Sequence, residues 1–455
     1  MEKYCDKKIL IVGVGKSGLA VLKYLIAKNA NVSIADDREY ENLSEEIQKV
    51  VRENNLKVYC GKNIEINETF EIVIVSPGVS LEKNIVLTQQ GKGAEVIGEL
   101  ELAYRAAKGN FVAITGTNGK TTTTSLVGEI FKVAQKDTRI VGNIGAPVID
   151  EASNSSDDTW FVTEASSFQL ESVVQFCPRV SAILNITPDH LDRHKTMDSY
   201  TSAKLKIGHA QLASDYEIVN KDDVILRAIN TYSHAKKAYF TKDNDVSLGT
   251  FVRDDAIFVK DDNGKEIHVI DIKEIPLPGT HNLENALAAT AICFFSGISK
   301  EDIRKGIISF KGVEHRVEIF KEFDGIRFIN DSKGTNPDAT IKAIEAMKEN
   351  IVLFAGGYDK NADYKEMLEF GKGKIKALYL IGQTKEKIKD QAIELGYEEI
   401  YTFENLAQCV KQAVALAVPG DNLLLSPACA SWGMYNNYEE RGREFKEEVI
   451  KILEG

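Results

Sequence analysis

The clearest chemical signal in the chain is ITGTNGKTTTT, residues 114–124, which follows an apolar run and leads into a helical pattern. Gly116 and Gly119 let the backbone approach a phosphate group, and Lys120 supplies a cation for β- and γ-phosphates. Thr121 offers a hydroxyl to Mg²⁺. The stretch therefore predicts a nucleoside triphosphate site.

This stretch is not a complete Walker A motif, because Ile114 stands five residues before Gly119, where that motif has glycine. The alternative is an ordinary turn in which Lys120 is solvated beside four successive threonines, which are poor helix formers. We favour a phosphate loop because the order of strand, glycines, Gly-Lys-Thr and helix keeps the needed chemistry.

A second glycine-rich stretch is KKILIVGVGKSGLAVLKYL, residues 7–25. After a buried strand pattern it has the spacing G-x-G-x-x-G, formed by Gly13, Gly15 and Gly18. Such glycines admit a diphosphate to the start of a helix, whose free N–H groups attract anions. Asp36 ends the next apolar run, where an acid could hold a ribose hydroxyl. The pattern alone leaves an NAD site open.

Three further side chains carry candidate metal ligands. Glu164 follows the apolar run TWFVT and offers hard oxygens for Mg²⁺, although the serines at 166 and 167 also fit an acid that caps a helix. His190 and His194 have a spacing that could bind zinc on a helix. Zinc is the weaker interpretation, because the pattern H-E-x-x-H is absent and a triphosphate site prefers Mg²⁺.

Length and composition restrict the class of protein. With 455 residues, 43% hydrophobic and 27% charged, the chain fits a globular protein of about two to three domains. A net charge of −12 without a concentrated Lys/Arg face argues against nucleic-acid binding. The polar start lacks a signal-peptide core, no apolar run could span a bilayer, and the six cysteines show no metal spacing. We expect a cytoplasmic protein with reduced thiols.

The elements that position these residues follow from the alternation along the chain. Strand-like apolar runs alternate with amphipathic helical stretches from end to end, which predicts an α/β protein with mainly parallel sheets. In open α/β sheets, ligands collect at the carboxyl ends of the strands. The polar loops after the strands are therefore where the site residues should gather.

Several stretches together resemble the ATP-dependent Mur ligase family of bacterial cell-wall synthesis. They cover the chain in order and are GTNGKTTTT, EASSFQLE, NITPDHLDRH, SAKLKI, LPGTHNLENALAA and HRVE. The resemblance implies three domains: a Rossmann-like N-terminal domain for a uridine nucleotide at 1–98, a central P-loop-type ATPase domain at 99–312, and a Rossmann-like C-terminal domain for an amino acid at 313–455.

Within this family, the stretches SPG, NDSKGTNP, AGGYDK and LSPACAS resemble the members that add D-glutamate to UDP-N-acetylmuramoyl-L-alanine. The resemblance implies an ATP- and Mg²⁺-dependent amide ligase that works through an acyl phosphate, as a monomer, on small molecules. A sister ligase with another amino acid, including a folylpolyglutamate synthetase, is one alternative. An NAD-binding protein and a non-catalytic nucleotide-binding protein are two more.

The resemblance also implies which residues act. Those around ATP are Gly116, Thr117, Asn118, Gly119, Lys120, Thr121, Thr122, Asn282, Asn285, Arg316 and Asp331. Those around the UDP substrate are Gly15, Lys16, Ser17, Asp36, Arg38, Ser76, Pro77, Gly78, Asn143 and His190. Those around D-glutamate are Lys333, Thr335, Lys360, Ser431 and Tyr438. The catalytic residues are Lys120, Glu164, His190 and Lys204, and the metal ligands are Thr121, Glu164, His190 and Lys204, the last as a carbamate formed with CO₂.

Some of these residues have plainer interpretations. Lys204 could instead be a solvated lysine on a helix, and Asn143 could be a turn residue before glycine. Asn282 fits a helix cap, and Arg316 a surface ion pair.

One stretch departs from the family. In LSPACASWGMYNNYEERG the family usually has Asp where Gly433 stands, and Phe where Tyr435 and Tyr438 stand. The tyrosines are conservative, whereas Gly433 removes a carboxylate near the amino-acid pocket.

Overall fold

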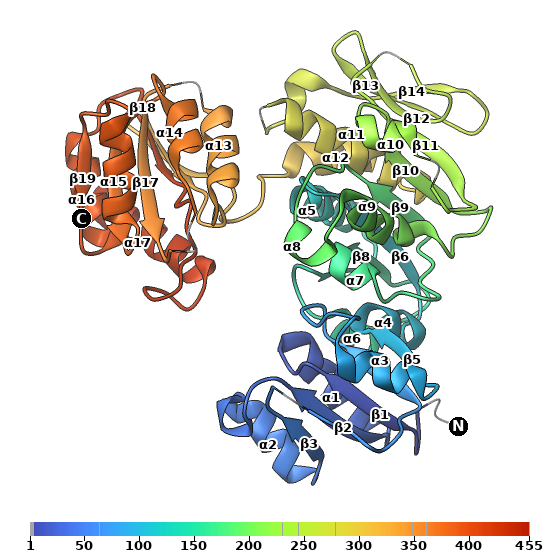
Figure 1. Cartoon of the computed structure of the whole chain (residues 1–455). Coiled ribbons are helices and arrows are strands. Elements are labelled where there is room, and N and C mark those ends of the chain that lie inside the picture. The colour runs from blue at the N-terminus through green and yellow to red at the C-terminus, as the bar shows by residue number, and fades with distance from the viewer. Residues whose placement is uncertain are drawn as a thin grey trace. The chain divides into compact units, whose positions relative to one another are not determined.

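The computed structural model describes residues 4–454 except 63, 230, 244, 278, 348, 360 and 361, and the backbone alone of Asp192. The chain divides into two compact units, Met1–Pro276 with Thr280–Phe310, and Leu277–Gly279 with Lys311–Gly455. Three separate sheets lie within them (Figure 1). The predicted α/β class, with three domains built on mainly parallel sheets, is confirmed, while the boundaries at 98 and 312 stay predictions.

The first sheet has the strand order β3-β2-β1-β4-β5, with every neighbour parallel. The aliphatic residues of β1 are almost wholly buried, as the predicted strand over 9–12 requires. The strands are β1 (Lys8–Val12), β2 (Asn31–Asp36), β3 (Lys57–Cys60), β4 (Ile72–Val75) and β5 (Glu95–Gly98). The helices are α1 (Lys16–Ala27), α2 (Glu45–Glu53), α3 (Asn84–Gly91) and α4 (Glu99–Ala106).

The second sheet has the order β14-β13-β12-β11-β10-β9-β6-β8-β7, parallel from β12 to β7 and antiparallel beyond β12. Its strands are β6 (Asn110–Thr115), β7 (Thr138–Gly142), β8 (Trp160–Glu164), β9 (Val180–Ile183), β10 (Tyr216–Asn220), β11 (Lys236–Phe240), β12 (Gly249–Arg253), β13 (Ala256–Lys260) and β14 (Glu266–Asp271). Its helices are α5 (Lys120–Val133), α6 (Val148–Ala152), α7 (Ser167–Leu170), α8 (Leu191–His194), α9 (Met197–Leu205), α10 (Val224–Ala228), α11 (Thr280–Phe295) and α12 (Lys300–Ser309). Because β6, β8 and β7 are neighbours, the loops that follow them meet at one edge.

The third sheet has the order β15-β16-β20-β17-β18-β19, parallel except for the pair β15 and β16. Its strands are β15 (Glu318–Phe323), β16 (Ile326–Asn330), β17 (Ile351–Gly357), β18 (Ile375–Gly382), β19 (Ile400–Thr402) and β20 (Asn422–Leu425). Its helices are α13 (Pro337–Ala346), α14 (Lys365–Gly371), α15 (Lys385–Glu394), α16 (Leu406–Leu416) and α17 (Tyr438–Glu454). The loops after β16 and β20 adjoin, since these strands pair directly.

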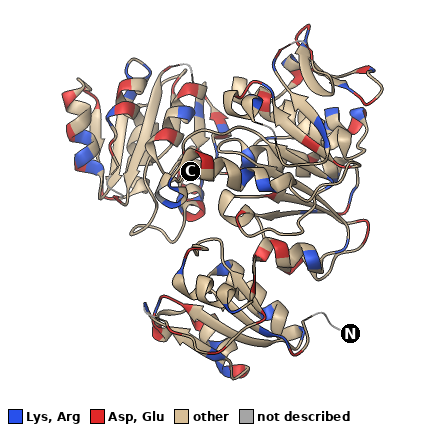
Figure 2. Cartoon of the chain, turned by 45° about the vertical axis from the view of Figure 1, so that its right-hand side comes forward, with Lys and Arg blue, Asp and Glu red and all other residues tan. Residues whose placement is uncertain are grey.

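Charges are mixed over the surface. Figure 2 shows Lys and Arg interspersed with Asp and Glu along the exposed helices and loops. Across the described part of the chain, no helix combines the length and apolar character needed to cross a bilayer.

Candidate active site

The phosphate loop, residues 116–120, joins β6 to α5 at the carboxyl edge of the second sheet. Gly119 has a φ of 84°, in the left-handed region that favours glycine. A Cβ on Gly119 would lie 2.6 Å from Asn285 Oδ1, and a Cβ on Gly116 would lie 2.9 Å from Leu184 Cβ. Both glycines are therefore required by packing, and the predicted order of strand, loop and helix is present.

Asn185, which comes soon after β9, holds the phosphate loop from the neighbouring strand. Its Oδ1 accepts a hydrogen bond from the Asn118 N–H at 2.8 Å, and its Nδ2 donates to the Asn118 carbonyl at 3.1 Å. Its carbonyl accepts from the Thr117 N–H at 3.0 Å. We had not predicted a role for Asn185, although a polar residue soon after a buried strand was the signal.

Two lysines converge on one carbonyl of this loop. Lys120 Nζ donates to the carbonyls of Gly116 and Thr117 at 2.7 and 2.8 Å, and Lys204 Nζ donates to the Gly116 carbonyl at 2.7 Å. Lys204 is only 1% exposed, so the interpretation of it as a solvated lysine is wrong. Burial, with the nearby charge of Lys120, lowers the pKa of Lys204 to about 6. A neutral amine therefore predominates at pH 7.

The start of α5 meets α11 at this loop. Thr121 and Thr122 lie in the first turn of α5 and are both buried. The Thr123 hydroxyl donates to Asn285 Oδ1 at 3.1 Å, and Asn285 Nδ2 donates to Asn282 Oδ1 at 3.4 Å. Asn282 lies inside α11, so its interpretation as a helix cap is wrong. The predicted ATP residues Thr121, Thr122, Asn282 and Asn285 thus lie where the start of α5 meets α11.

Glu164 ends β8 beside the phosphate loop, since β8 pairs with β6. It is 1% exposed, its Oε1 accepts from Asn143 Nδ2 at 2.7 Å, and its Oε2 has no partner among the described residues. The cap of α7 is Ser166, in a capping box with Gln169, so Glu164 is not the capping acid. A buried carboxylate oxygen without a partner fits a divalent cation.

The two histidines of the segment DHLDRH face different partners. His190 lies at the start of α8 with a φ of 52°, and its half-exposed ring packs 4.9 Å from the Phe168 ring. His194 is buried, with Nε2 2.9 Å from Ser167 Oγ and Nδ1 3.3 Å from a Glu171 oxygen. Among the described residues, neither histidine belongs to a cluster of three metal ligands. This arrangement leaves His190 as the ligand candidate and His194 as a support of the loop.

The first glycine loop, residues 13–18, is held by packing on both sides. A Cβ on Gly18 would lie 2.2 Å from the Gly13 carbonyl oxygen, whereas no described heavy atom lies within 4 Å of a Cβ on Gly15. The Ser76 hydroxyl donates to the Gly13 carbonyl at 2.6 Å, which brings the predicted segment 76–78 to this loop. Gly15 therefore differs from Gly13 and Gly18, because the fold does not require it to be glycine.

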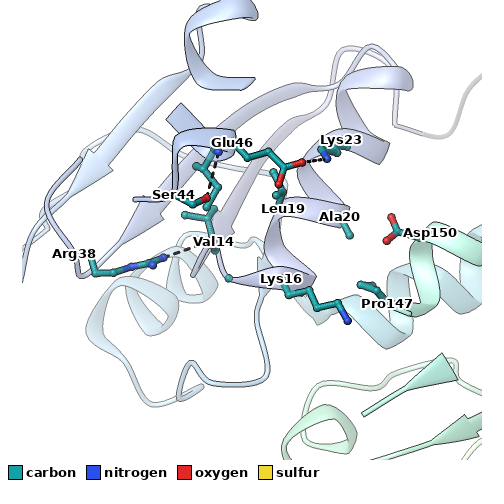
Figure 3. A pocket seen from close by; sticks show the side chains of 12 residues that line it. Val14, Lys16, Leu19, Ala20, Lys23, Arg38, Ser44, Glu46, Pro147 and Asp150 are labelled. Carbon is teal, nitrogen blue, oxygen red and sulfur yellow. Dashed lines mark hydrogen bonds and ion pairs between the residues drawn. The ribbon is translucent and has the colours of Figure 1, made fainter. Parts of the chain in front are cut away.

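A cavity of about 430 Å³ opens beside the first glycine loop (Figure 3). Gly15, Lys16 and Arg38 line it, and Ser17 lies beside them in the first turn of α1. Lys16 Nζ donates to the Gly145 carbonyl at 3.0 Å. The cavity brings the predicted residues of this loop together around a space of ligand size.

Asp36 braces the first glycine loop. Its two oxygens accept hydrogen bonds from the Val14 and Arg38 N–H groups at 2.9 and 3.1 Å, and from the Arg38 guanidinium at 2.8 and 2.9 Å. Burial raises the pKa of Asp36, but the hydrogen bonds from Arg38 and Val14 outweigh it and lower the pKa to about 2. The Asp36 carboxylate therefore already accepts four hydrogen bonds from within the protein.

In the second unit, Asp331 follows β16 and is 4% exposed. It accepts hydrogen bonds from the Ser426 hydroxyl at 2.6 Å and the Val317 N–H at 3.2 Å. Burial raises its pKa to about 7, against the opposing effects of the Ser426 hydrogen bond and the charge of Arg316. Arg316 therefore lies near enough to Asp331 for its charge to act on this carboxyl group, while the roles of both residues stay predictions.

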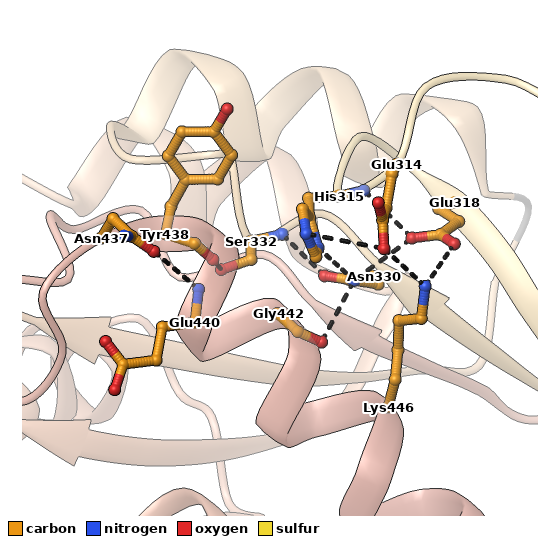
Figure 4. Close-up of polar contacts among 10 residues, drawn as sticks. All are labelled: Glu314, His315, Glu318, Asn330, Ser332, Asn437, Tyr438, Glu440, Gly442 and Lys446. Atoms are coloured by element: carbon orange, nitrogen blue, oxygen red, sulfur yellow. Dashed lines mark hydrogen bonds and ion pairs between the residues drawn. The ribbon is translucent and has the colours of Figure 1, made fainter.

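A polar cluster fixes the segment that carries Arg316 (Figure 4). Ligand atoms of Glu314, His315 and Glu318 lie within 4.8 Å of one another. Lys446 of α17 pairs with Glu314 at 3.0 Å and with Glu318 at 2.8 Å. Since the Lys446 ammonium group already neutralises the carboxylates of Glu314 and Glu318, we interpret this cluster as a structural contact rather than a metal site.

Four of the predicted D-glutamate residues lie in the loops that follow β16 and β20 or directly after them. Lys333 Nζ lies 5.8 Å from the centre of the Tyr438 ring, and Ser431 is buried. Thr335 lies half-buried in the loop before α13. Lys360 falls outside the described residues.

Arg441 connects these two loops and was missed in the sequence. It is 1% exposed, and it donates to the Ser332 hydroxyl at 3.0 Å and the Ser332 carbonyl at 2.8 Å. It also donates to the Cys429 carbonyl at 3.1 Å. A buried guanidinium with three hydrogen bonds to two loops fixes their spacing.

Gly433 has a φ of 82°, and no described heavy atom lies within 4 Å of the position of a Cβ. The left-handed backbone explains why glycine suits this chain, since aspartate would be strained there. The space around the Cβ position alone would not exclude an aspartate at position 433.

Three domain families match the chain. They are a MurD-like N-terminal domain of Mur ligases at residues 7–98, a Mur ligase middle domain at 114–293, and a Mur ligase glutamate ligase domain at 315–429. A UDP-N-acetylmuramoylalanine--D-glutamate ligase from Alkaliphilus oremlandii is 47% identical over 98% of this chain and 99% of its own. The protein of the same name from Clostridioides difficile is 43% identical over 98% and 99%.

Solved structures show the same fold. The UDP-N-acetylmuramate-alanine ligase MurC from Thermotoga maritima aligns with a TM-score of 0.59 at 19% identity, over 98% of this chain and all of that chain. MurF ligase from the same organism, in complex with ADP, aligns with a TM-score of 0.57 at 15% identity, over 99% and 96%. These likenesses agree with the three sheets described above.

Proposed function

The chain belongs to the Mur ligase family, and from that premise we propose that it joins D-glutamate to UDP-N-acetylmuramoyl-L-alanine at the expense of ATP, in peptidoglycan precursor synthesis. The observation that carries the chemistry is the phosphate loop, where Lys120, buried Lys204 and the unpartnered oxygen of Glu164 converge. A cation and candidate metal ligands at one loop suit phosphoryl transfer.

The first step activates the alanine carboxylate. A carboxylate oxygen attacks the γ-phosphorus of ATP, the bond to the β-phosphate oxygen breaks, and ADP leaves. Lys120 would release its two carbonyl contacts to bind phosphate oxygens, because an anion is a stronger partner than a neutral carbonyl. Thr121, Thr122, Asn282 and Asn285 would hold the nucleotide at the start of α5.

The second step forms the amide bond. The D-glutamate amine attacks the acyl carbon, inorganic phosphate leaves, and the amine nitrogen loses a proton. Lys333, Thr335, Ser431 and Tyr438 would position D-glutamate, whose two carboxylates need cations and hydroxyl groups. Positioning of the reacting atoms supplies much of the rate.

The donor set fits Mg²⁺. Thr121, Glu164, His190 and a carbamylated Lys204 would hold it, and when bound it neutralises charge on the transferring phosphoryl group. The lowered pKa of Lys204 supports carbamylation, because only the neutral amine attacks CO₂, forming a carbamate and releasing a proton. The new carboxylate would also replace a buried amine that shares the Gly116 carbonyl with Lys120.

The N-terminal cavity would take the uridine diphosphate, with Lys16 and Ser17 near the diphosphate and Asp36 and Arg38 near the uracil. We further propose that the protein acts as a monomer in the cytoplasm. The described cysteines are all free, which suits a reducing compartment.

The test is phosphate release from ATP and Mg²⁺ with UDP-N-acetylmuramoyl-L-alanine, in the presence of D-glutamate, L-glutamate or no amino acid. We expect release that requires both the UDP substrate and D-glutamate. Phosphate release that requires another amino acid in place of D-glutamate would support the proposed ATP site and overturn the assignment of the third domain to D-glutamate. Release without the UDP substrate would overturn the ligase.

A further inference from the structure

Arg193, in α8, ties the segment that carries His190 to the N-terminal domain. Its Nη1 donates to the Pro77 carbonyl at 3.1 Å, and its Nη2 donates to the Val79 carbonyl at 3.0 Å. Nη2 also donates to Glu171 Oε2 at 2.6 Å. The Arg193 and Glu171 side chains are 17% and 19% exposed, so the pair is largely shielded from solvent.

One end of this contact reaches the first glycine loop. The Ser76 hydroxyl bonds the Gly13 carbonyl, and a Cβ on Gly13 would lie 2.7 Å from Val79 Cγ2. Residues 76–79 therefore pack directly behind the loop that lines the N-terminal cavity. A ligand that moves the first glycine loop must also move the carbonyls that Arg193 holds.

The other end reaches His190. The guanidinium carbon of Arg193 lies 4.5 Å from the centre of the Phe168 ring, and the same ring packs 4.9 Å from the His190 ring. Glu171 in turn contacts His194 Nδ1 at 3.3 Å. Arg193, Glu171 and Phe168 thus form one packed group that sets the position of both histidines.

We propose that Arg193, oriented by Glu171, is a positioning residue that couples occupation of the N-terminal cavity to the placement of His190, which we propose as a Mg²⁺ ligand. The inference rests on the proposed function, because it takes the two ligands to be a UDP-sugar peptide and ATP. The guanidinium suits this task, since it stays charged and its fork binds two carbonyls and a carboxylate at once. Coupling of this kind changes affinity by about 5- to 150-fold.

The test compares nucleotide binding with and without the other substrate. The affinity for a non-hydrolysable ATP analogue with Mg²⁺ is measured by calorimetry in the absence and presence of saturating UDP-N-acetylmuramoyl-L-alanine. We expect the wild-type ratio of the two affinities to be at least about 10-fold. In Arg193→Met and Glu171→Gln, each ligand alone should bind within about 3-fold of wild type, while the ratio falls towards 1.

Arg105→Met is the matched control. Arg105 is also shielded and pairs with Glu95 and Glu101, and no described hydrogen bond or ion pair joins it to either loop. It should keep the wild-type ratio even where it lowers the melting temperature. If Arg193→Met fails to fold, Arg193→Lys, which keeps the charge but loses the fork, should give an intermediate ratio.

Three outcomes separate the two proposals. A wild-type ratio near 1, or a ratio unchanged in the Arg193 and Glu171 variants, overturns the coupling and leaves the ligase intact. A wild-type protein that does not bind the UDP substrate at all overturns the proposed function itself.

Discussion

The first glycine loop and the phosphate loop share a backbone plan and differ in what surrounds them. Each follows a buried parallel strand and opens a helix. The first is braced by Asp36, whose oxygens hold Val14 and Arg38, whereas the phosphate loop carries two lysines on the Gly116 carbonyl. Glycine spacing therefore controls how closely a phosphate can approach, while the neighbouring strands and helices determine whether the loop only binds or also supports chemistry.

The largest difference should appear when each loop loses its lysine. Lys120→Ala should lower kcat by about 10³-fold, because it removes charge stabilisation of the transition state. Lys16→Ala should instead raise KM for the UDP substrate by about 10-fold and leave kcat within about 3-fold, because a binding contact is lost. Steady-state phosphate release measures both, and an equal effect of the two substitutions on kcat would contradict the contrast.

The second largest difference should be in the dependence on CO₂, which should affect catalysis at the phosphate loop and not binding at the first glycine loop. Protein stripped of bicarbonate should lose about 10²-fold in kcat and recover when CO₂ is added, while its affinity for the UDP substrate stays constant. With the pKa of Lys204 at about 6, the neutral amine increases about tenfold between pH 5 and pH 7, so recovery at fixed dissolved CO₂ should speed up with rising pH. Lys204→Arg is the control and should not respond to CO₂.

The brace of the first glycine loop should have a smaller effect, visible in stability. Asp36→Asn should lower the free energy of unfolding by on the order of 2 kcal/mol at neutral pH. The folded pKa of Asp36, about 2, lies below its unfolded value, so this contribution is complete above the unfolded pKa and is lost as pH falls towards 2. Urea unfolding of both proteins from pH 7 to pH 3 measures it, and a difference that grows in acid would refute the assignment.

The smallest expected effect on stability is at Gly15. Gly15→Ala should change the free energy of unfolding by less than about 0.5 kcal/mol, because the added Cβ meets open space. It should still raise KM for the UDP substrate, if the backbone there approaches the diphosphate. Gly18→Ala is the contrasting variant, with a Cβ 2.2 Å from the Gly13 carbonyl oxygen, and thermal unfolding should show a clear loss.

The sequence predicts what local patterns determine. The strands before both loops, the start of α5 and the position of Glu164 at the end of β8 could be predicted, because buried runs, glycines and polar residues at strand ends are local signals. The burial of Lys204 could not, since it depends on contact with Gly116, 88 residues earlier in the chain. Only the family resemblance indicated that lysine.

The same reason explains the residues that were missed. Arg193 contacts Pro77 across 116 residues, and Arg441 contacts Ser332 across 109. Each is an arginine in a polar helical stretch, for which a solvated surface position is the usual expectation. Their burial follows from how domains and loops pack, which periodicity does not reveal.

The order of strands in the third sheet has a consequence for how the protein is made. The strands of the first sheet are complete once the ribosome has translated residue 98. In the third sheet, β20 lies between β16 and β17, although it follows β19 in the chain. During translation the N-terminal part can fold early, while the third sheet lacks a middle strand until residues 422–425 have emerged. The contacts that Arg441 makes between the loops after β16 and β20 can therefore form only late in the synthesis of each new chain.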